Sequence, residues 1–198
     1  MEKKKFYIIM GRSGSGKGTQ TTLFKTYLEG KGVKDVVHVT TGGGFREFVA
    51  GDSYAAKMSR HLNDTGGLQP EFLAIWNWSN IFINTLKGEE TVILDGAPRK
   101  PVEVYALEGA ITFFGYDMPT IIYIDVSEGW ACEKLSSRGR PDDIEKEAQE
   151  RKMNWFMEEV LPCIDIYKHD ARYGFIHVNG EQSVEDVHKE IVAKLEAQ

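Results

Sequence analysis

Glycine, lysine and threonine residues near the start of the chain have the spacing of a loop that binds phosphate groups. The segment Gly11–Thr19 reads G-R-S-G-S-G-K-G-T; an apolar run that ends at Met10 precedes it, and a helical pattern, Gln20–Leu28, follows it. A strand, a glycine loop and a helix in this order surround an anion with backbone N–H groups and the positive end of a helix dipole. A glycine-rich turn with a surface lysine is the simpler alternative, but it leaves the flanking patterns unexplained. The residues predicted to bind a nucleoside triphosphate here are Gly14, Ser15, Gly16, Lys17, Gly18 and Thr19.

Two oxygen-bearing side chains are candidates to meet a magnesium ion that accompanies the triphosphate. Thr19 follows Lys17, whose ammonium group supplies a point charge for the β- and γ-phosphates. Asp95 ends the apolar run Thr91–Asp95, and a carboxylate at the end of a parallel strand suits an ion held through water. A helix or turn cap is the alternative role for Asp95. The sequence thus predicts magnesium contact at Thr19 and, through water, at Asp95.

Arginines recur at the predicted starts of loops and helices, on a chain whose net charge is negative. A solvated surface position explains any one of them. As a set they suit a site where two polyphosphates are brought close together, because guanidinium groups bind phosphate oxygens in pairs. The arginines concerned are Arg46, Arg99, Arg138, Arg140 and Arg151.

Alternating strand and helix patterns must position these side chains. Strands are predicted at 4–10, 34–39, 91–95, 120–126 and 174–178. Helices are predicted at 20–28, 45–50, 54–64, 71–86, 101–114, 127–135, 144–169 and 184–196, and the aromatic helix 71–86 is expected to be mostly core. This order indicates right-handed crossovers and a doubly wound α/β domain with a five-stranded parallel sheet, of the kind found in P-loop nucleoside triphosphate hydrolases. Ligands of such a sheet bind beyond the carboxyl ends of the strands, where Lys17, Thr41, Asp95 and Arg99 fall.

Composition narrows the class of protein. A chain of 198 residues with 41% hydrophobic and 27% charged residues suits one globular domain, and a net charge of −6 argues against a general nucleic-acid or membrane-surface binder. No apolar run approaches the ~20 residues of a membrane span. Two cysteines, Cys132 and Cys163, lack metal-ligand spacing and indicate a reducing compartment. We therefore expect a cytoplasmic protein, and a monomer, that contacts neither nucleic acid nor membrane.

Six ordered segments together resemble the adenylate kinase family of nucleoside monophosphate kinases, over nearly the whole chain. Gly11–Gln20 is similar to the family's G-x-x-G-S-G-K-G-T-Q, and Asp95–Arg99 is similar to its D-G-[FY]-P-R. The other matching segments are His38–Arg46, Gly67–Glu71, Gly139–Asp143 with Arg151, and Asn179–Val184.

The resemblance implies reversible transfer of the γ-phosphoryl group of ATP, with Mg²⁺, to AMP, giving two ADP. It implies a monophosphate-binding insertion at 40–70 and a short lid loop at 136–143, both expected to close on substrate; a lid without the cysteine-bearing insertion of long-lid members is not expected to hold structural zinc. Lys17, Arg99, Arg140 and Arg151 would act in catalysis, and Arg138 and backbone at Gln182 would contact the donor adenine. The implied monophosphate site comprises Thr41, Arg46, Gly67, Leu68, Gln69, Gly96, Arg99, Glu103, Arg140 and Arg151.

Three positions depart from the family pattern. Gly43 replaces an acid linked to the magnesium water shell, and Ala97 replaces an aromatic residue. Glu103 stands four residues after Arg99, where adenylate kinases usually carry Gln. A carboxylate only accepts hydrogen bonds, so it suits the donors of guanine or cytosine better than adenine unless it is protonated.

Rival functions remain at this stage. AMP is the expected acceptor, and GMP, CMP or UMP are the alternatives that Glu103 raises. A nucleotide-binding module without catalysis is a hypothesis of another class. Gly43 and Glu103 favour it, and the retained Lys17, Arg99, Arg140 and Arg151 oppose it. A nucleoside or shikimate-type kinase would not need the paired segments at Thr41–Arg46 and Gly67–Pro70.

Overall fold

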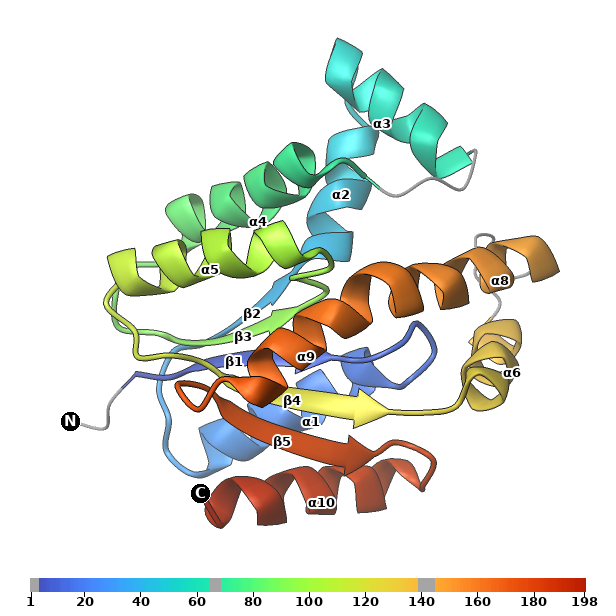
Figure 1. The fold of residues 1–198 in the computed structure, drawn as a ribbon. Helices are drawn as coiled ribbons and strands as arrows, with labels where there is room; N and C mark the ends of the chain where they lie inside the picture. Colours follow the sequence, from blue (N-terminus) through green and yellow to red (C-terminus); the bar gives the residue numbers. More distant parts are fainter. Residues whose placement is uncertain (1–3, 65–68, 139–144) are drawn as a thin grey trace.

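A five-stranded parallel sheet forms the centre of the molecule in the computed structural model, which describes residues 4–64, 69–138 and 145–198 (Figure 1). Apolar, β-branched runs buried on both faces build its middle strands, as expected for a sheet covered by helices on both sides. The strand order is β2-β3-β1-β4-β5, which confirms the doubly wound sheet predicted from the sequence. The strands are β1 (Phe6–Met10), β2 (Val36–Thr40), β3 (Thr91–Asp95), β4 (Thr120–Asp125) and β5 (Gly174–Asn179).

Two helices cover one face of the sheet, α1 (Lys17–Gly30) and α10 (Val184–Glu196) (Figure 1). Phe24 of α1 and Ile191 of α10 are fully buried against the middle of the sheet. The Ser183 hydroxyl accepts a hydrogen bond from Asp186 N, so a side-chain cap fixes the start of α10.

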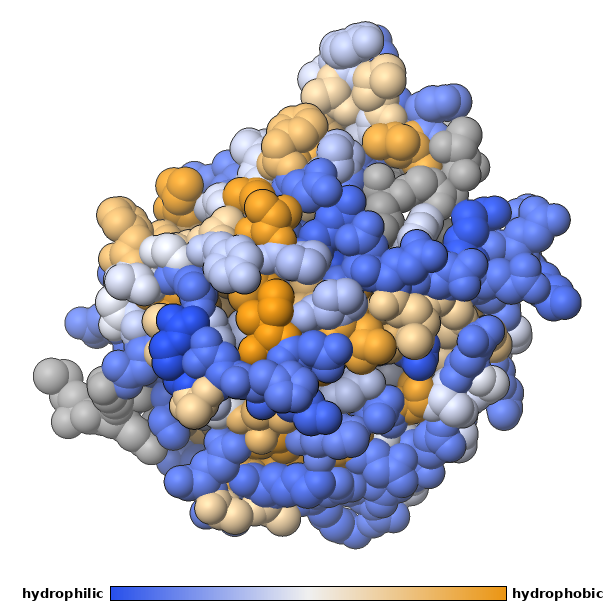
Figure 2. All heavy atoms as spheres, in the orientation of Figure 1, coloured by the Kyte–Doolittle hydropathy of each residue, from blue (hydrophilic) through white to orange (hydrophobic). Residues whose placement is uncertain are grey.

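The other face is covered by α4 (Glu71–Thr85), α5 (Pro101–Phe113) and α9 (Leu161–His169). Trp78 and Phe82 of α4 and Leu107 of α5 belong to the larger hydrophobic cluster and are at most 1% exposed. The outer sides of α4 and α5 are apolar as well, and Figure 2 shows hydrophobic side chains gathered there. Phe72 and Ile83 are each 70% exposed. The expectation that the aromatic helix is mostly core therefore holds only for its inner face.

Two helices, α2 (Thr41–Val49) and α3 (Tyr54–Asp64), project beyond the carboxyl end of β2 (Figure 1). The sequence predicted that the first of them begins at Phe45, but it begins at Thr41 and includes three glycines. Glycine disfavours a helix interior, so a tertiary contact must compensate. The Asn77 amide of α4 donates to Thr41 O at 2.9 Å, and a Cβ on Gly44 would overlap the Asn77 side chain. Glycine is therefore required where α2 crosses α4.

The segment predicted as one helix, 144–169, is a continuous helix from residue 146 in which one turn is π-helical. It comprises α8 (Lys146–Trp155), a π-helical turn η1 (Phe156–Val160) and α9. Helix α6 (Glu128–Arg138) extends three residues beyond its predicted end at 135. Residues 136–138 of the predicted lid loop are therefore helical, and the remainder, 139–143, lies outside the described residues. In the portions of the chain that the structure describes, no helix has the length and apolar character to cross a membrane.

Candidate active site

The glycine loop leaves the end of β1 and packs tightly against β4 and α6. Gly11 has φ +150°, and a Cβ on it would lie 2.5 Å from Ile124 O. Gly14 has φ +90°, and its Cβ would overlap the Ala131 carbonyl of α6. Only glycine fits these two close approaches. The loop ends at Gly16, and α1 begins at Lys17, as the phosphate-loop interpretation requires.

The Lys17 ammonium group is folded back onto its own loop. Its Nζ donates to Gly11 O at 2.7 Å and to Arg12 O at 2.8 Å. Burial lowers the pKa of Lys17 from 10.5 to about 8; the charge of Asp95 opposes this shift, while Arg99 and Arg138 add to it. The charges on Lys17, Asp95, Arg99 and Arg138 therefore act on one another, which is the arrangement expected of a site for a polyanion.

One cleft joins the glycine loop, the loop after β3 and the long helix. Among the candidate residues, Lys17, Gly96 and Arg99 line it. The opposite wall comes from the long helix that contains α8 and η1; Arg151 of α8 was a predicted site residue, but the residues that line this wall were not predicted. The lining residues of this wall are Lys152, Trp155, Phe156 and Val160. The sequence signal that could have identified these residues is their spacing of three to four positions on a predicted helix, but residues packed in a core have the same spacing.

Thr41 and Arg99 converge on the carbonyl group of Gly96. Thr41 Oγ1 donates to Gly96 O at 2.9 Å, and Arg99 Nε donates to the same oxygen at 3.0 Å. Arg99 is exposed. Arg46 lies on α2 beside the same region, because a Cβ on Gly42 would lie 3.4 Å from Arg46 Nη1. Two guanidinium groups are thus brought to the carboxyl ends of β2 and β3.

Glu103 is a buried cap of α5. Its Oε1 accepts hydrogen bonds from Arg99 N and Lys100 N, each at 3.2 Å, so it links the loop that carries Arg99 to α5. The residue is 2% exposed, and burial raises the pKa of its carboxyl group while the Arg99 N–H and charge oppose that shift. The structural role of Glu103 was not predicted from the sequence, although acid at the third position of a helix is a known capping signal. One carboxylate oxygen is committed to this cap.

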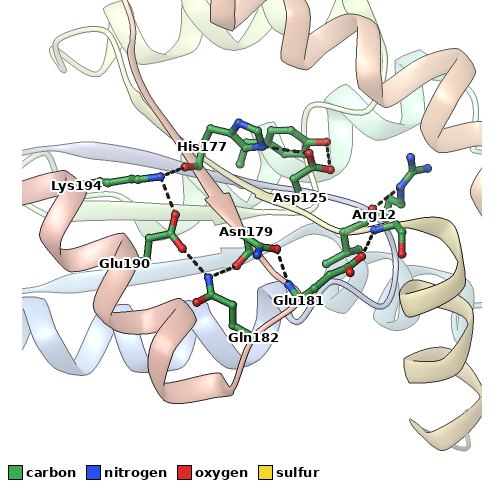
Figure 3. A network of polar contacts seen from close by, with 11 residues as sticks. Arg12, Asp125, His177, Asn179, Glu181, Gln182, Glu190 and Lys194 are labelled. Atoms are coloured by element: carbon green, nitrogen blue, oxygen red, sulfur yellow. Dashed lines mark hydrogen bonds and ion pairs between the residues drawn. The ribbon is translucent and has the colours of Figure 1, made fainter.

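The remaining candidates do not line this cleft or lie outside the described residues. Gln69 is bonded to α3, since Ser59 Oγ donates to Gln69 Oε1 at 2.8 Å and Gln69 Nε2 donates to Ser59 O at 3.0 Å. The Gln182 side-chain amide donates to Asn179 O and Glu190 Oε2 (Figure 3). Gly67, Leu68 and Arg140 lie outside the described residues.

Arg138 and Arg151 belong to the two helices α6 and α8. Arg138 ends α6, and its charge lowers the pKa of Lys17. Arg151 belongs to α8, next to the cleft residue Lys152, and its Nε is buried without a hydrogen-bond partner in the described part of the chain. A buried donor without a partner is costly unless a ligand satisfies it.

Oxygen donors at the carboxyl ends of β1 and β3 fit a magnesium ion. Asp95 is half-buried at the end of β3, level with Ile9 of β1 and Thr40 of β2. Thr19 lies in the first turn of α1 with its side chain exposed. A carboxylate and a hydroxyl are ligands that Mg²⁺ accepts, directly or through water, and neither group is soft enough to favour zinc or copper.

Comparison with known proteins agrees with this geometry. A family model described as adenylate kinase matches residues 9–172. Adenylate kinases of Phocaeicola vulgatus and Stenotrophomonas maltophilia K279a are 30% and 26% identical, covering 96% of this chain in each case and 97% and 98% of the relatives. Adenylate kinase of the distant Encephalitozoon cuniculi is 28% identical over 96% of this chain and 97% of its own length.

Proposed function

The chain belongs to the adenylate kinase family, and we propose that its cleft catalyses reversible transfer of the γ-phosphoryl group of ATP to AMP, giving two ADP. The observation that carries the proposal is the meeting of Lys17 and Arg99 in one cleft. Lys17 comes from the donor loop and Arg99 from the loop after β3, so two phosphate groups can be held face to face. Transfer between them needs little covalent help from the protein, and positioning with charge neutralisation supplies the catalysis.

On the donor side, the glycine loop surrounds the β- and γ-phosphates with backbone N–H groups. Lys17 leaves the carbonyl groups of Gly11 and Arg12 and turns to the transferred phosphate. Arg138 stacks near the adenine, and backbone at Gln182 accepts or donates at its edge. Thr19 directly and Asp95 through water would hold the magnesium ion that accompanies ATP, and that ion would supply neutralising charge for the phosphates.

On the acceptor side, Arg46 and Arg99 hold the phosphate of the monophosphate. Arg140 and Arg151 bridge both phosphate groups as charge spreads in the transition state. The insertion 40–70 supplies the base pocket, with Thr41, Gly67, Leu68, Gln69, Gly96 and Glu103 as its candidate residues. This insertion and the predicted lid, whose residues 136–138 continue helix α6, exclude water, which limits hydrolysis of ATP.

An acceptor panel tests the function. Purified protein with Mg²⁺–ATP is offered AMP, GMP, CMP or UMP, and ADP formation is followed in a coupled assay. We expect AMP to give the highest kcat/KM. Preference for GMP or CMP would instead indicate that the Glu103 carboxylate reads base donors, and no turnover with any acceptor would contradict the enzyme proposal in favour of a binding module.

Glu103→Gln is expected to raise the kcat/KM for AMP relative to GMP and CMP by about tenfold, the value of one hydrogen bond of about 1.4 kcal/mol. A glutamine keeps the oxygen that accepts from Arg99 N and Lys100 N, and adds an amide N–H for adenine N1. The measurement is the same acceptor panel, run on wild type and variant.

Glu108→Gln is the matched control for this exchange. Glu108 lies on the same helix but pairs with Arg172 and Tyr173 at its far end. We expect this control to leave the acceptor ratios unchanged. Unchanged ratios in Glu103→Gln as well would show that Glu103 serves only as the cap of α5.

A further inference from the structure

The side chain of Arg12, in the glycine loop, is half-buried and contacts Val126, Phe156 and Met157. Its Nε donates to Val126 O at 3.0 Å (Figure 3). Its guanidinium plane lies over the Phe156 ring, 4.3 Å from the centroid. Both outer nitrogens approach Met157 Sδ at 3.5 Å. A planar guanidinium can stack and donate at the same time, which an ammonium group cannot do.

The residues that Arg12 contacts lie next to the ends of two helices. Val126 comes two residues before α6 begins, and Phe156 directly follows the end of α8. Helix α6 ends at Arg138, and α8 carries Arg151. Arg12 is thus bonded next to α6 and α8, two helices that carry candidate arginines.

The backbone of Arg12 holds the resting form of the loop. Its carbonyl oxygen accepts from Lys17 Nζ at 2.8 Å and from Ser15 N at 3.1 Å. A movement of Arg12 would therefore shift the turn of the loop and the position of Lys17. Side chain and backbone of one residue join the phosphate loop, Lys17 and the two arginine-bearing helices.

The contact surface for Arg12 is built by the π-helical turn η1. Phe156, its first residue, is 2% exposed, and Phe156 and Val160 both line the cleft. On the other side of the turn, Glu159 lies 3.7 Å from Lys100, which also pairs with Glu71 at 2.9 Å. A π-helical turn widens a helix locally, and such turns are frequent at functional sites. The turn therefore contacts Arg12 of the donor loop and pairs with Lys100, the residue after Arg99.

We infer that Arg12 is a positioning residue for phosphoryl transfer. It holds the phosphate loop next to the start of α6 through Val126 and next to the end of α8 through Phe156. Lys17, Arg138 and Arg151 then keep one arrangement around the phosphates. The inference rests on the proposed function. It assigns Arg12 no contact with substrate.

Arg12→Ala and Arg12→Lys test the inference by steady-state kinetics and thermal unfolding. Both variants are expected to lower kcat/KM for ATP about tenfold, the effect of a small displacement in a positioned site, and to leave KM for AMP within twofold. Lysine fails because it cannot stack on Phe156 while donating to Val126 O. Activity restored by lysine would mean that Arg12 binds phosphate as a charge, and unchanged KM and kcat for ATP in both variants would mean a purely structural contact; either result overturns the inference.

A double-mutant cycle with Phe156→Leu gives the second readout. If Arg12 acts through the aromatic ring, Phe156→Leu lowers kcat/KM for ATP in wild type and has less than a twofold effect in Arg12→Ala. Independent, multiplying effects contradict the inference. Wild-type turnover in the same assay separates the two hypotheses, because an inactive wild type contradicts the proposed function itself.

Discussion

Replacing Arg99 with alanine is expected to lower kcat/KM for phosphoryl transfer by about a thousandfold or more while the fold stays intact. Arg99 lines the cleft opposite the donor loop, and single arginines that neutralise transferred phosphate have effects of this order. The side chain is exposed, so its removal leaves no buried cavity. Because the charge of Arg99 lowers the pKa of Lys17, the variant should also show a raised Lys17 pKa. Steady-state kinetics with AMP as acceptor measures the loss of kcat/KM, and thermal unfolding checks that the fold is intact.

Arg172→Ala is the matched control, since it removes one guanidinium group at the opposite edge of the sheet. Arg172 precedes β5 and pairs with Asp170 at 2.6 Å and Glu108 at 2.9 Å on the surface. We expect near-wild-type turnover from it. Retained activity in Arg99→Ala, or equal losses in both variants, would contradict the role of Arg99 in holding phosphate.

The sheet was predictable because its signals are local. The segment Thr91–Asp95 is apolar up to a terminal acid, and β3 has the same bounds as the prediction. Helix α10 begins where Ser183 provides a cap, and Pro101 occupies the first turn of α5. Where sequence neighbours decide the backbone conformation, one sequence is sufficient.

Features that depend on distant residues escaped prediction. The helical start at Thr41 depends on Asn77, 36 residues away, and the π-helical turn has no sequence signal of its own. The cleft wall formed by Trp155 and Phe156 required knowledge of how the long helix crosses the glycine loop. Motif spacing therefore predicted that Lys17 and Arg99 share a site, and tertiary packing decided what faces them.

Glu103 illustrates the same division within a single residue. Its chemistry, a carboxylate that accepts and does not donate, was visible in the sequence and raised the question of the acceptor base. Its burial and its bonds to Arg99 N and Lys100 N were not, because they depend on the path of the chain before α5. The residue type of Glu103 suggested a role in base specificity, but the same side chain also has a structural role as the cap of α5.

Lys17→Met is expected to abolish phosphoryl transfer, with kcat/KM reduced by about a thousandfold or more, and at the same time to stabilise the protein. The loss follows from removing the charge that would meet the transferred phosphate. The gain follows because burial lowers the pKa of Lys17 from 10.5 to about 8, so the charged ammonium group costs folding free energy below pH 8; loss of its bonds to Gly11 O and Arg12 O offsets part of the gain. Activity assays and urea unfolding at constant ionic strength measure the two effects.

The pH dependence of this stability difference has a definite sign. Between about pH 8 and 10.5 the unfolded chain binds a proton at Lys17 that the folded protein has released, so wild-type stability rises with pH. The advantage of Lys17→Met should therefore be largest below pH 8 and shrink as pH approaches 10.5. Lys25→Met, on the exposed side of the same helix with its ammonium 3.8 Å from Glu29, should change stability by less than about 0.5 kcal/mol at every pH. A Lys17→Met protein that is less stable than wild type at pH 7, or equally more stable at pH 7 and 10, would show that the buried ammonium group carries no such cost.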